Sequence, residues 1–167
     1  MQVTGLKTFL QLAAVLSVVG FHSIAQAAIV VDLEVNASQT KLEATTRGNC
    51  SQNNTNGCVR VSGNQNINFN LGNYSCASGG SWSLSQVFLG NSKNSRGSIS
   101  TVAASDFNAD QSSGLVSPAG NPNTNHIQIR DNNTQAYDIW YTVTATCGSS
   151  TIELDPRIEN DGSGHPN

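Results

Sequence analysis

Charged side chains are scarce in this sequence. Only 11% of its 167 residues are Asp, Glu, Lys or Arg, and eight basic residues stand against 11 acidic ones. So few basic residues give no electropositive surface of the kind that binds nucleic acid. The net charge of −3 is also too low for an acidic, intrinsically disordered chain. The composition therefore argues against a nucleic-acid-binding protein and against a charged disordered tail.

Long apolar runs are scarce as well. Phe9–Gly20 is an apolar run of twelve residues, and a membrane-spanning helix needs about 20. Lys7 precedes this run and Ala25-Gln26-Ala27 follows it. A basic start, a short apolar core and a small-x-small end are the parts of a secretory signal peptide. We therefore expect a signal peptide at 1–27, a single domain at 28–160, and a secreted product, extracellular or periplasmic, with no membrane span after cleavage.

Cysteine is rare, but its count is even. All four cysteines lie after residue 27, and an even number in an exported chain is typical of two disulfides. Three pairings are possible. We favour Cys50–Cys58 with Cys76–Cys147, because the first pair closes a short loop that has no apolar residue to hold it by packing. Zinc is the poorer alternative, since the sequence has no C-x-x-C pair.

Small polar residues are abundant: 20 Asn, 21 Ser, 13 Thr and 15 Gly. In several segments they alternate with apolar residues, and a period of two is typical of a half-buried β-strand. A break in this phase between Leu84 and Val87 predicts a β-bulge near Gln86. The alternating segments are 31–35, 59–61, 67–71, 82–85, 127–129, 137–147 and 151–154.

About seven strands with turn residues between them predict the fold class. We expect an all-β protein, a single immunoglobulin-like antiparallel β-sandwich stabilised by disulfides. The short Gly148-Ser149 connection predicts a hairpin, and Asp155-Pro156 is expected to end the last clear strand. Residues 103–125 read as a long polar loop, and residues 161–167 as a flexible C-terminal tail.

The end of the chain resembles a known group of proteins. Tyr141-Thr142-Val143-Thr144-Ala145 and Ile152-Glu153-Leu154-Asp155-Pro156-Arg157-Ile158-Glu159-Asn160 are similar to the close of small bacterial β-sandwich proteins of the DP-EP family and the related crystalline inclusion-body proteins. The resemblance covers about the last fifth of the chain. It implies a β-sandwich with a non-catalytic role and transfers no functional residue. The chain departs from the inclusion-body branch in its expected signal peptide, its cysteines and its single Met.

Catalytic motifs are missing from the sequence. There is no G-x-S-x-G, no H-E-x-x-H and no P-loop, and paired cysteines leave no thiol nucleophile. Asp131 and Asp138 flank one predicted hairpin, where turn formation explains them as well as glycoside hydrolysis does. We therefore predict that the protein is not an enzyme, with a small secreted hydrolase as the last alternative.

Two sets of residues are candidates for ligand binding. The side chains of Asp106, Asn108, Asp110 and Ser112 follow the alternate spacing of the first ligands in a calcium loop. The match stops there, because Gln111 and Ser117 stand where such loops carry Gly and Glu. A polar loop with Asx turns is the alternative interpretation.

The second set is Trp140 with Asp138. Both lie on the outward phase of the strand predicted at 137–147, and an outward Trp can stack against a sugar ring. Alternatively, a loop covers it. The sequence as a whole predicts a secreted, non-catalytic β-sandwich at the cell surface or in the extracellular matrix, acting by self-association or, alternatively, by binding calcium or a surface glycan.

Overall fold

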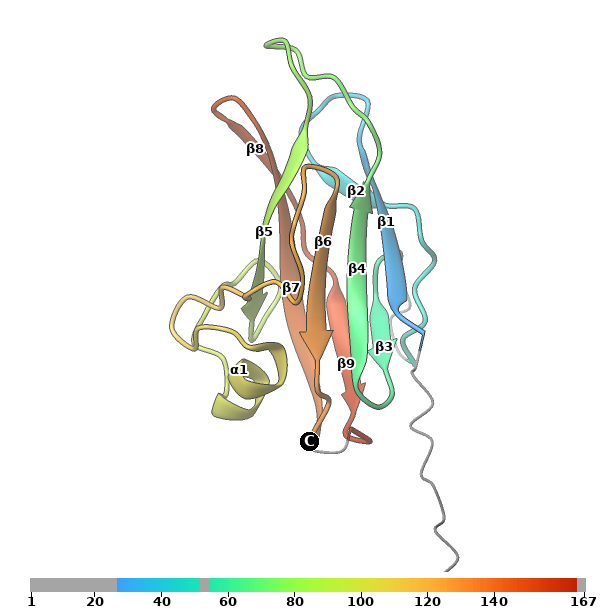
Figure 1. The fold of residues 1–167 in the computed structure, drawn as a ribbon, viewed down its shortest axis with the longest axis vertical. Coiled ribbons are helices and arrows are strands. Elements are labelled where there is room, and N and C mark those ends of the chain that lie inside the picture. The colour runs from blue at the N-terminus through green and yellow to red at the C-terminus, as the bar shows by residue number, and fades with distance from the viewer. Residues whose placement is uncertain (1–26, 52–54, 165–167) are drawn as a thin grey trace, which may run out of the picture.

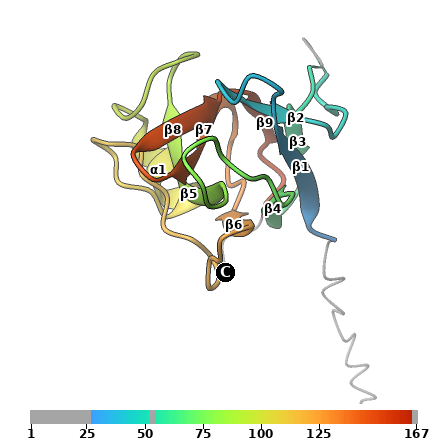
Figure 2. The same ribbon diagram turned by 90° about the horizontal axis from the view of Figure 1, so that it is seen from above.

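The computed structural model describes residues 27–51 and 55–164. The expected signal peptide lies outside these residues, apart from Ala27. Within them, no helix is long and apolar enough to cross a membrane. The chain forms two β-sheets packed face to face, which confirms the predicted all-β sandwich (Figures 1 and 2).

The first sheet has four strands in the order β2–β1–β4–β6. β1 pairs with β4 in parallel, whereas its pairing with β2 and the pairing of β4 with β6 are antiparallel. The bounds are β1 Ile29–Val35, β2 Leu42–Ala44, β4 Gln65–Leu71 and β6 His126–Asp131.

The second sheet has five strands, with β3–β9–β7–β5 in order and β8 paired to β7. β3 runs parallel to β9, and the remaining pairs are antiparallel. Both sheets are therefore mixed, and the expectation of a purely antiparallel sandwich is wrong. The bounds are β3 Val59–Val61, β5 Ser83–Gly90, β7 Ala136–Cys147, β8 Ser150–Leu154 and β9 Arg157–Asp161.

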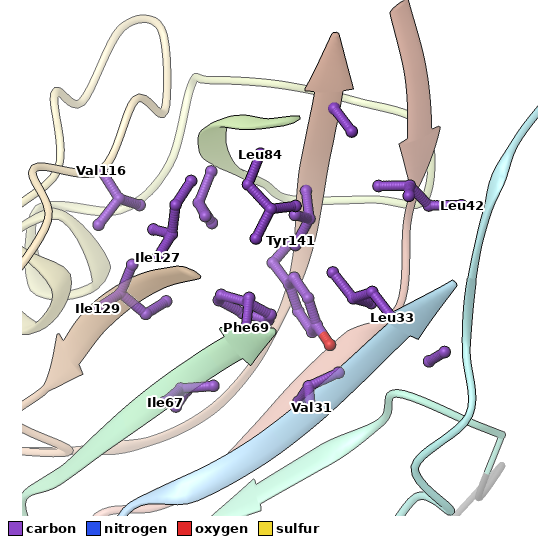
Figure 3. Packing of buried hydrophobic residues seen from close by; sticks show 14 of the residues in the cluster. Val31, Leu33, Leu42, Ile67, Phe69, Leu84, Val116, Ile127, Ile129 and Tyr141 are labelled. Atoms are coloured by element: carbon purple, nitrogen blue, oxygen red, sulfur yellow. The ribbon is translucent and has the colours of Figure 1, made fainter. Parts of the chain in front are cut away.

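The inward side chains of both sheets form one core. Along β7, Ile139, Tyr141 and Val143 are buried and alternate with outward residues, as the period of two predicts. Tyr141 lies at the centre of the core beside Phe69, with ring centroids 5.2 Å apart (Figure 3). Its hydroxyl donates to the carbonyl of Gly57 (2.5 Å), so the core also holds the segment before Cys58.

The described residues form nine strands, where about seven were expected. The additions are β2, a three-residue edge strand, and β9, which begins directly after Pro156. Val143 lies opposite Leu154 and Trp140 opposite Arg157, so β8 and β9 follow β7 in one continuous register. Pro156 interrupts the ladder without ending it, because its carbonyl still accepts the Tyr141 N–H (3.0 Å). The missing proline donor breaks the strand only locally.

The polar stretch at 103–125 also differs from the expectation, because it starts inside a helix. α1 (Thr101–Phe107) begins after Ser100, whose hydroxyl accepts the Ala103 N–H (3.1 Å) as an N-cap. Phe107 is fully buried and anchors the helix to the sandwich. α1 lies beside the lower ends of the strands in Figure 1. So short a helix has too few positions to display an apolar stripe in the sequence.

The local features predicted at the cysteines and in β5 are confirmed. The disulfides are Cys50–Cys58 and Cys76–Cys147. The register of β5 on β7 shifts between Leu84 and Gln86, as expected for a β-bulge. Cys147 lies opposite Ser150 across the tight β7–β8 hairpin.

The segment expected to be a flexible tail is held to the domain as far as it is described. Asp161 belongs to β9. The Gly162 N–H donates to Asn133 Oδ1 and the Gly164 N–H to the Asn133 carbonyl, both at 2.8 Å. Residues 165–167 lie outside the described residues.

Candidate functional site

Trp140 and Asp138 lie on the outer face of the five-stranded sheet, as their phase in the sequence predicts. Trp140 is half-buried, and Asp138 is exposed. Across the sheet, Trp140 is opposite Arg157 on β9 and Gly90 on β5. A Cβ at Gly90 would lie 2.1 Å from the Ser95 carbonyl oxygen, so only glycine lets the loop after β5 return this close to the sheet.

A hollow of about 310 Å³ opens at Trp140. Its floor is the sheet, and its sides come from two loops. Lys93 belongs to the loop after β5, and Thr55 belongs to the loop closed by the Cys50–Cys58 disulfide. The lining residues are Thr55, Lys93, Trp140, Asp155 and Arg157.

A second hollow of about 460 Å³ lies beside the first and shares Arg157 with it. Asp138 and Glu159 face each other there across β7 and β9, and like charges at opposed positions repel. The guanidinium of Arg157 offsets this repulsion, since it lies 2.9 Å from Asp138 Oδ2 and 3.7 Å from Glu159 Oε2. The Ser51 hydroxyl donates to Glu159 Oε1 (2.5 Å), and this bond is the main reason why the pKa of Glu159 lies below its usual value.

Behind this surface, on the inner side of the same strands, lies a buried polar cluster that the sequence did not reveal. Asp106, at the end of α1, accepts bonds from the Thr134 N–H (3.1 Å), the Thr134 hydroxyl (2.7 Å) and the Tyr137 hydroxyl (3.0 Å). These bonds tie α1 to the β6–β7 connection. Burial is the main cause of the raised pKa of Tyr137, and the charges of Asp131 and Asp106 add to it.

Asp131 is the most deeply enclosed acid of the cluster and is fully buried. Its Oδ1 accepts from the Asn133 N–H (2.8 Å) and from Asn160 Nδ2 (3.2 Å). Among the described residues, neither Asp131 Oδ2 nor Asn160 Oδ1 has a hydrogen-bond partner. Burial, together with the nearby charges of Asp106 and Asp161, raises the pKa of Asp131 to about 7.

The structure separates the four residues considered as calcium ligands. Asp106 is buried and accepts bonds from Thr134 and Tyr137, whereas Asp110 is exposed and accepts from the Ser113 N–H (2.7 Å) and hydroxyl (2.8 Å). The bond from the Ser113 N–H is the main cause of the lowered pKa of Asp110. Asn108 is the left-handed C-cap of α1, and Ser112 is exposed. The spacing that suggested a calcium loop thus belongs to a helix end and an Asx turn.

Within residues 27–51 and 55–164, no group of three or more His, Cys, Asp or Glu side chains is arranged to hold a metal ion. The hollow at Trp140 makes this face the candidate ligand site. The sequence predicted Trp140 and Asp138, but not Arg157, Glu159, Lys93 or Thr55. Arg157 and Glu159 follow Pro156, where no strand was expected, and the other two reach the face from loops.

No protein-family model matches the chain, and no curated protein matches it.

Proposed function

We propose that this protein is exported and acts at the cell surface or in the extracellular matrix as a non-enzymatic, carbohydrate-binding β-sandwich. The observation that carries the proposal is the half-buried Trp140 in a hollow edged by charged and hydroxyl side chains. An aromatic ring packs against the apolar face of a sugar, and carboxyl, guanidinium and hydroxyl groups bond to its hydroxyls. Trp140, Asp155, Arg157 and Thr55 offer this combination.

Two further features support the proposal of export. The chain contains two disulfides, and such bonds persist in oxidising compartments outside the cytoplasm. Residues 1–27 also have the composition of a signal peptide. The resemblance of the last fifth of the chain to DP-EP and inclusion-body proteins agrees with a non-catalytic role. Fractionating cells that express the full chain tests the location: recovery from the periplasm, the surface or the medium supports it, and recovery from the cytoplasm contradicts it.

A glycan array tests the binding. We expect the purified protein to bind at least one carbohydrate and the Trp140→Ala variant to lose that binding. Tyr74→Ala is the matched control, because Tyr74 is also a half-buried aromatic side chain but does not line the hollow at Trp140. Equal binding by the wild type and Trp140→Ala would contradict the proposed site.

Self-association is the second candidate, and the outer face of the four-stranded sheet favours it. Uncharged amides lie there in rows: Gln128 donates to Asn68 Oδ1 (2.7 Å), and Asn70 lies against His126 (2.8 Å). Ladders of Asn side chains stack well between chains. Sizing and electron microscopy of concentrated protein test this candidate, and a strictly monomeric protein would reject it.

A further inference from the structure

The hollow at Trp140 is the middle of a longer depression. It shares Arg157 with the hollow of Asp138 and Glu159 on one side. On the other side it shares Thr55, Lys93 and Asp155 with a third hollow of about 440 Å³, which lies where β8 meets β2. We call the three together the outer groove.

The outer groove is elongated along the strands. Glu159 lines one end of it and Glu153 the other, and the two belong to the strands β9 and β8 that share one register on β7. Six residues of extended chain separate them, which is about 20 Å. A single sugar ring fills only part of this length, whereas several rings joined end to end match it.

One side of the outer groove is formed by three described residues that lie between Cys50 and Cys58. Ser51 lines the hollow of Asp138 and Glu159. Thr55 lines both the hollow at Trp140 and the third hollow, and Asn56 lines the third. Ser51 is bonded to Glu159, and the Tyr141 hydroxyl holds the carbonyl of Gly57. The disulfide therefore fixes a wall that carries hydroxyl and amide groups along the groove.

The outer groove has no surplus of positive charge to hold a polyanion. Its lining carries three basic side chains, Lys41, Lys93 and Arg157, against five carboxyl groups. Two more arginines pair with these carboxyl groups, since Arg96 binds Glu153 and Arg60 Nε lies 3.8 Å from Glu159 Oε1. A chain of uronates or sulfated sugars therefore finds no net attraction, whereas the hydroxyls of a neutral sugar chain bond to acidic and basic groups alike. The five carboxyl groups are those of Glu43, Asp138, Glu153, Asp155 and Glu159.

We propose that the ligand of the outer groove is a neutral, linear polysaccharide, held along several sugar units and bordered on one side by Ser51, Thr55 and Asn56. The proposal rests on the proposed function and specifies its ligand. Trp140 stacks on a central ring, Arg157 and Asp138 bond to units on one side, and Lys93 and Asp155 bond to units on the other. An internal segment of a chain is bound rather than its end, because the groove continues on both sides of Trp140.

Calorimetric titration with oligomers of one to six units tests the chain length. The probes are β-1,4-linked glucose and β-1,4-linked N-acetylglucosamine oligomers, with oligomeric alginate as the polyanion of similar length. In at least one neutral series we expect affinity to rise about tenfold or more from one unit to four and to level off by six. Alginate should bind at least about tenfold more weakly than the best neutral oligomer.

A variant of the loop tests the wall. The double variant Cys50→Ser/Cys58→Ser leaves the Cys76–Cys147 disulfide intact. A far-ultraviolet circular dichroism spectrum equal to that of the wild type shows that the variant retains the sandwich. We expect this variant to bind the four-unit oligomer about tenfold more weakly and to approach the wild type on the single sugar. Thr55→Ala, which leaves the disulfide in place, serves as the second variant and should weaken the four-unit oligomer in the same sense.

The outcomes separate the two proposals. If the array shows a Trp140-dependent glycan but neither neutral series gains affinity with length, the carbohydrate-binding function stands and the extended-chain ligand is overturned. Preference for alginate, or full affinity in both loop variants, would also overturn it. If no glycan binds in a Trp140-dependent way, both proposals fail.

Discussion

Two neighbouring pairs of residues on β7 and β9 have opposite roles. Tyr137 lies opposite Asn160, and one step along the strands Asp138 lies opposite Glu159. The first pair points into the buried polar cluster around Asp106 and Asp131, and the second points outward into the groove beside Trp140. The strand period of two is enough to send consecutive polar residues to the interior and to the surface.

The environments of the two pairs explain this difference. In the interior, the carboxylate oxygens of Asp106 accept three hydrogen bonds from neighbouring residues and are closed to solvent. These bonds therefore stabilise the attachment of α1 to the sandwich. On the outer face, Asp138 keeps half of its side chain exposed while bonded to Arg157. Polar groups that are enclosed and bonded stabilise the fold, whereas those left accessible in a hollow can bond to a ligand.

Among the changes that test this comparison, Asp106→Ala is expected to have the largest effect on stability. The change leaves the Thr134 N–H, the Thr134 hydroxyl and the Tyr137 hydroxyl without their acceptor inside the protein. We expect a loss of about 3 kcal/mol in the free energy of unfolding, measured by urea denaturation.

Asp138→Ala is its matched control on the outer face, where removing an exposed partner of an ion pair should cost about 0.5 kcal/mol. If the two variants lose the same stability, the distinction between the interior and the face is wrong.

The next largest effect is on the pH dependence of stability. Because the pKa of Asp131 is raised to about 7 in the folded protein from 3.8, the folded state keeps a proton that the unfolded state loses. The contribution of this group is therefore complete below about pH 4 and falls steadily as the pH rises to about 7.

Asp131→Asn isolates that contribution. The amide does not titrate, so the decline between pH 4 and 7 should disappear from the urea-unfolding free energy of the variant. The pKa values of Glu159 and Asp110 are lowered, so these two carboxylates stabilise the folded state at neutral pH and lose that contribution only as the pH falls into the acidic range. Parallel pH profiles for the wild type and Asp131→Asn would show that Asp131 does not carry a proton.

The smallest effect is expected from calcium. Asp106 is buried and its oxygens are already bonded, while Asp110 is exposed and bonded to Ser113. Adding EDTA or millimolar calcium should therefore leave the melting temperature unchanged in differential scanning calorimetry. A rise with calcium that Asp110→Ala removes would restore the calcium loop predicted from the sequence.

The sequence predicted those parts of the fold that depend on local pattern. Alternation located the strand of Tyr141, and the small polar loop between Cys50 and Cys58 indicated the disulfide pairing. It also placed Trp140 on the outer face. It failed at Asp155-Pro156, since register on β7 carries the ladder past a proline, and this is a tertiary effect.

The buried polar cluster and the groove lay beyond prediction for the same reason. Asp106 meets Thr134, and Thr55 meets Lys93 and Trp140, only because distant segments pack together. Parallel pairing of β1 with β4 and of β3 with β9 likewise leaves no signature in alternation. The spacing from Asp106 to Ser112 did not reveal the helix end at Asn108, because a helix end and a metal loop can show the same succession of polar residues.

The chain has two tryptophans, and they provide the most direct test of the proposed site. Trp82 is buried in the core, whereas Trp140 lines the outer groove. In a titration of ¹⁵N-labelled protein with the neutral tetrasaccharide that binds best, we predict that the indole N–H signal of Trp140 shifts and that of Trp82 stays in place. Saturating binding that leaves the Trp140 signal unmoved would contradict the account.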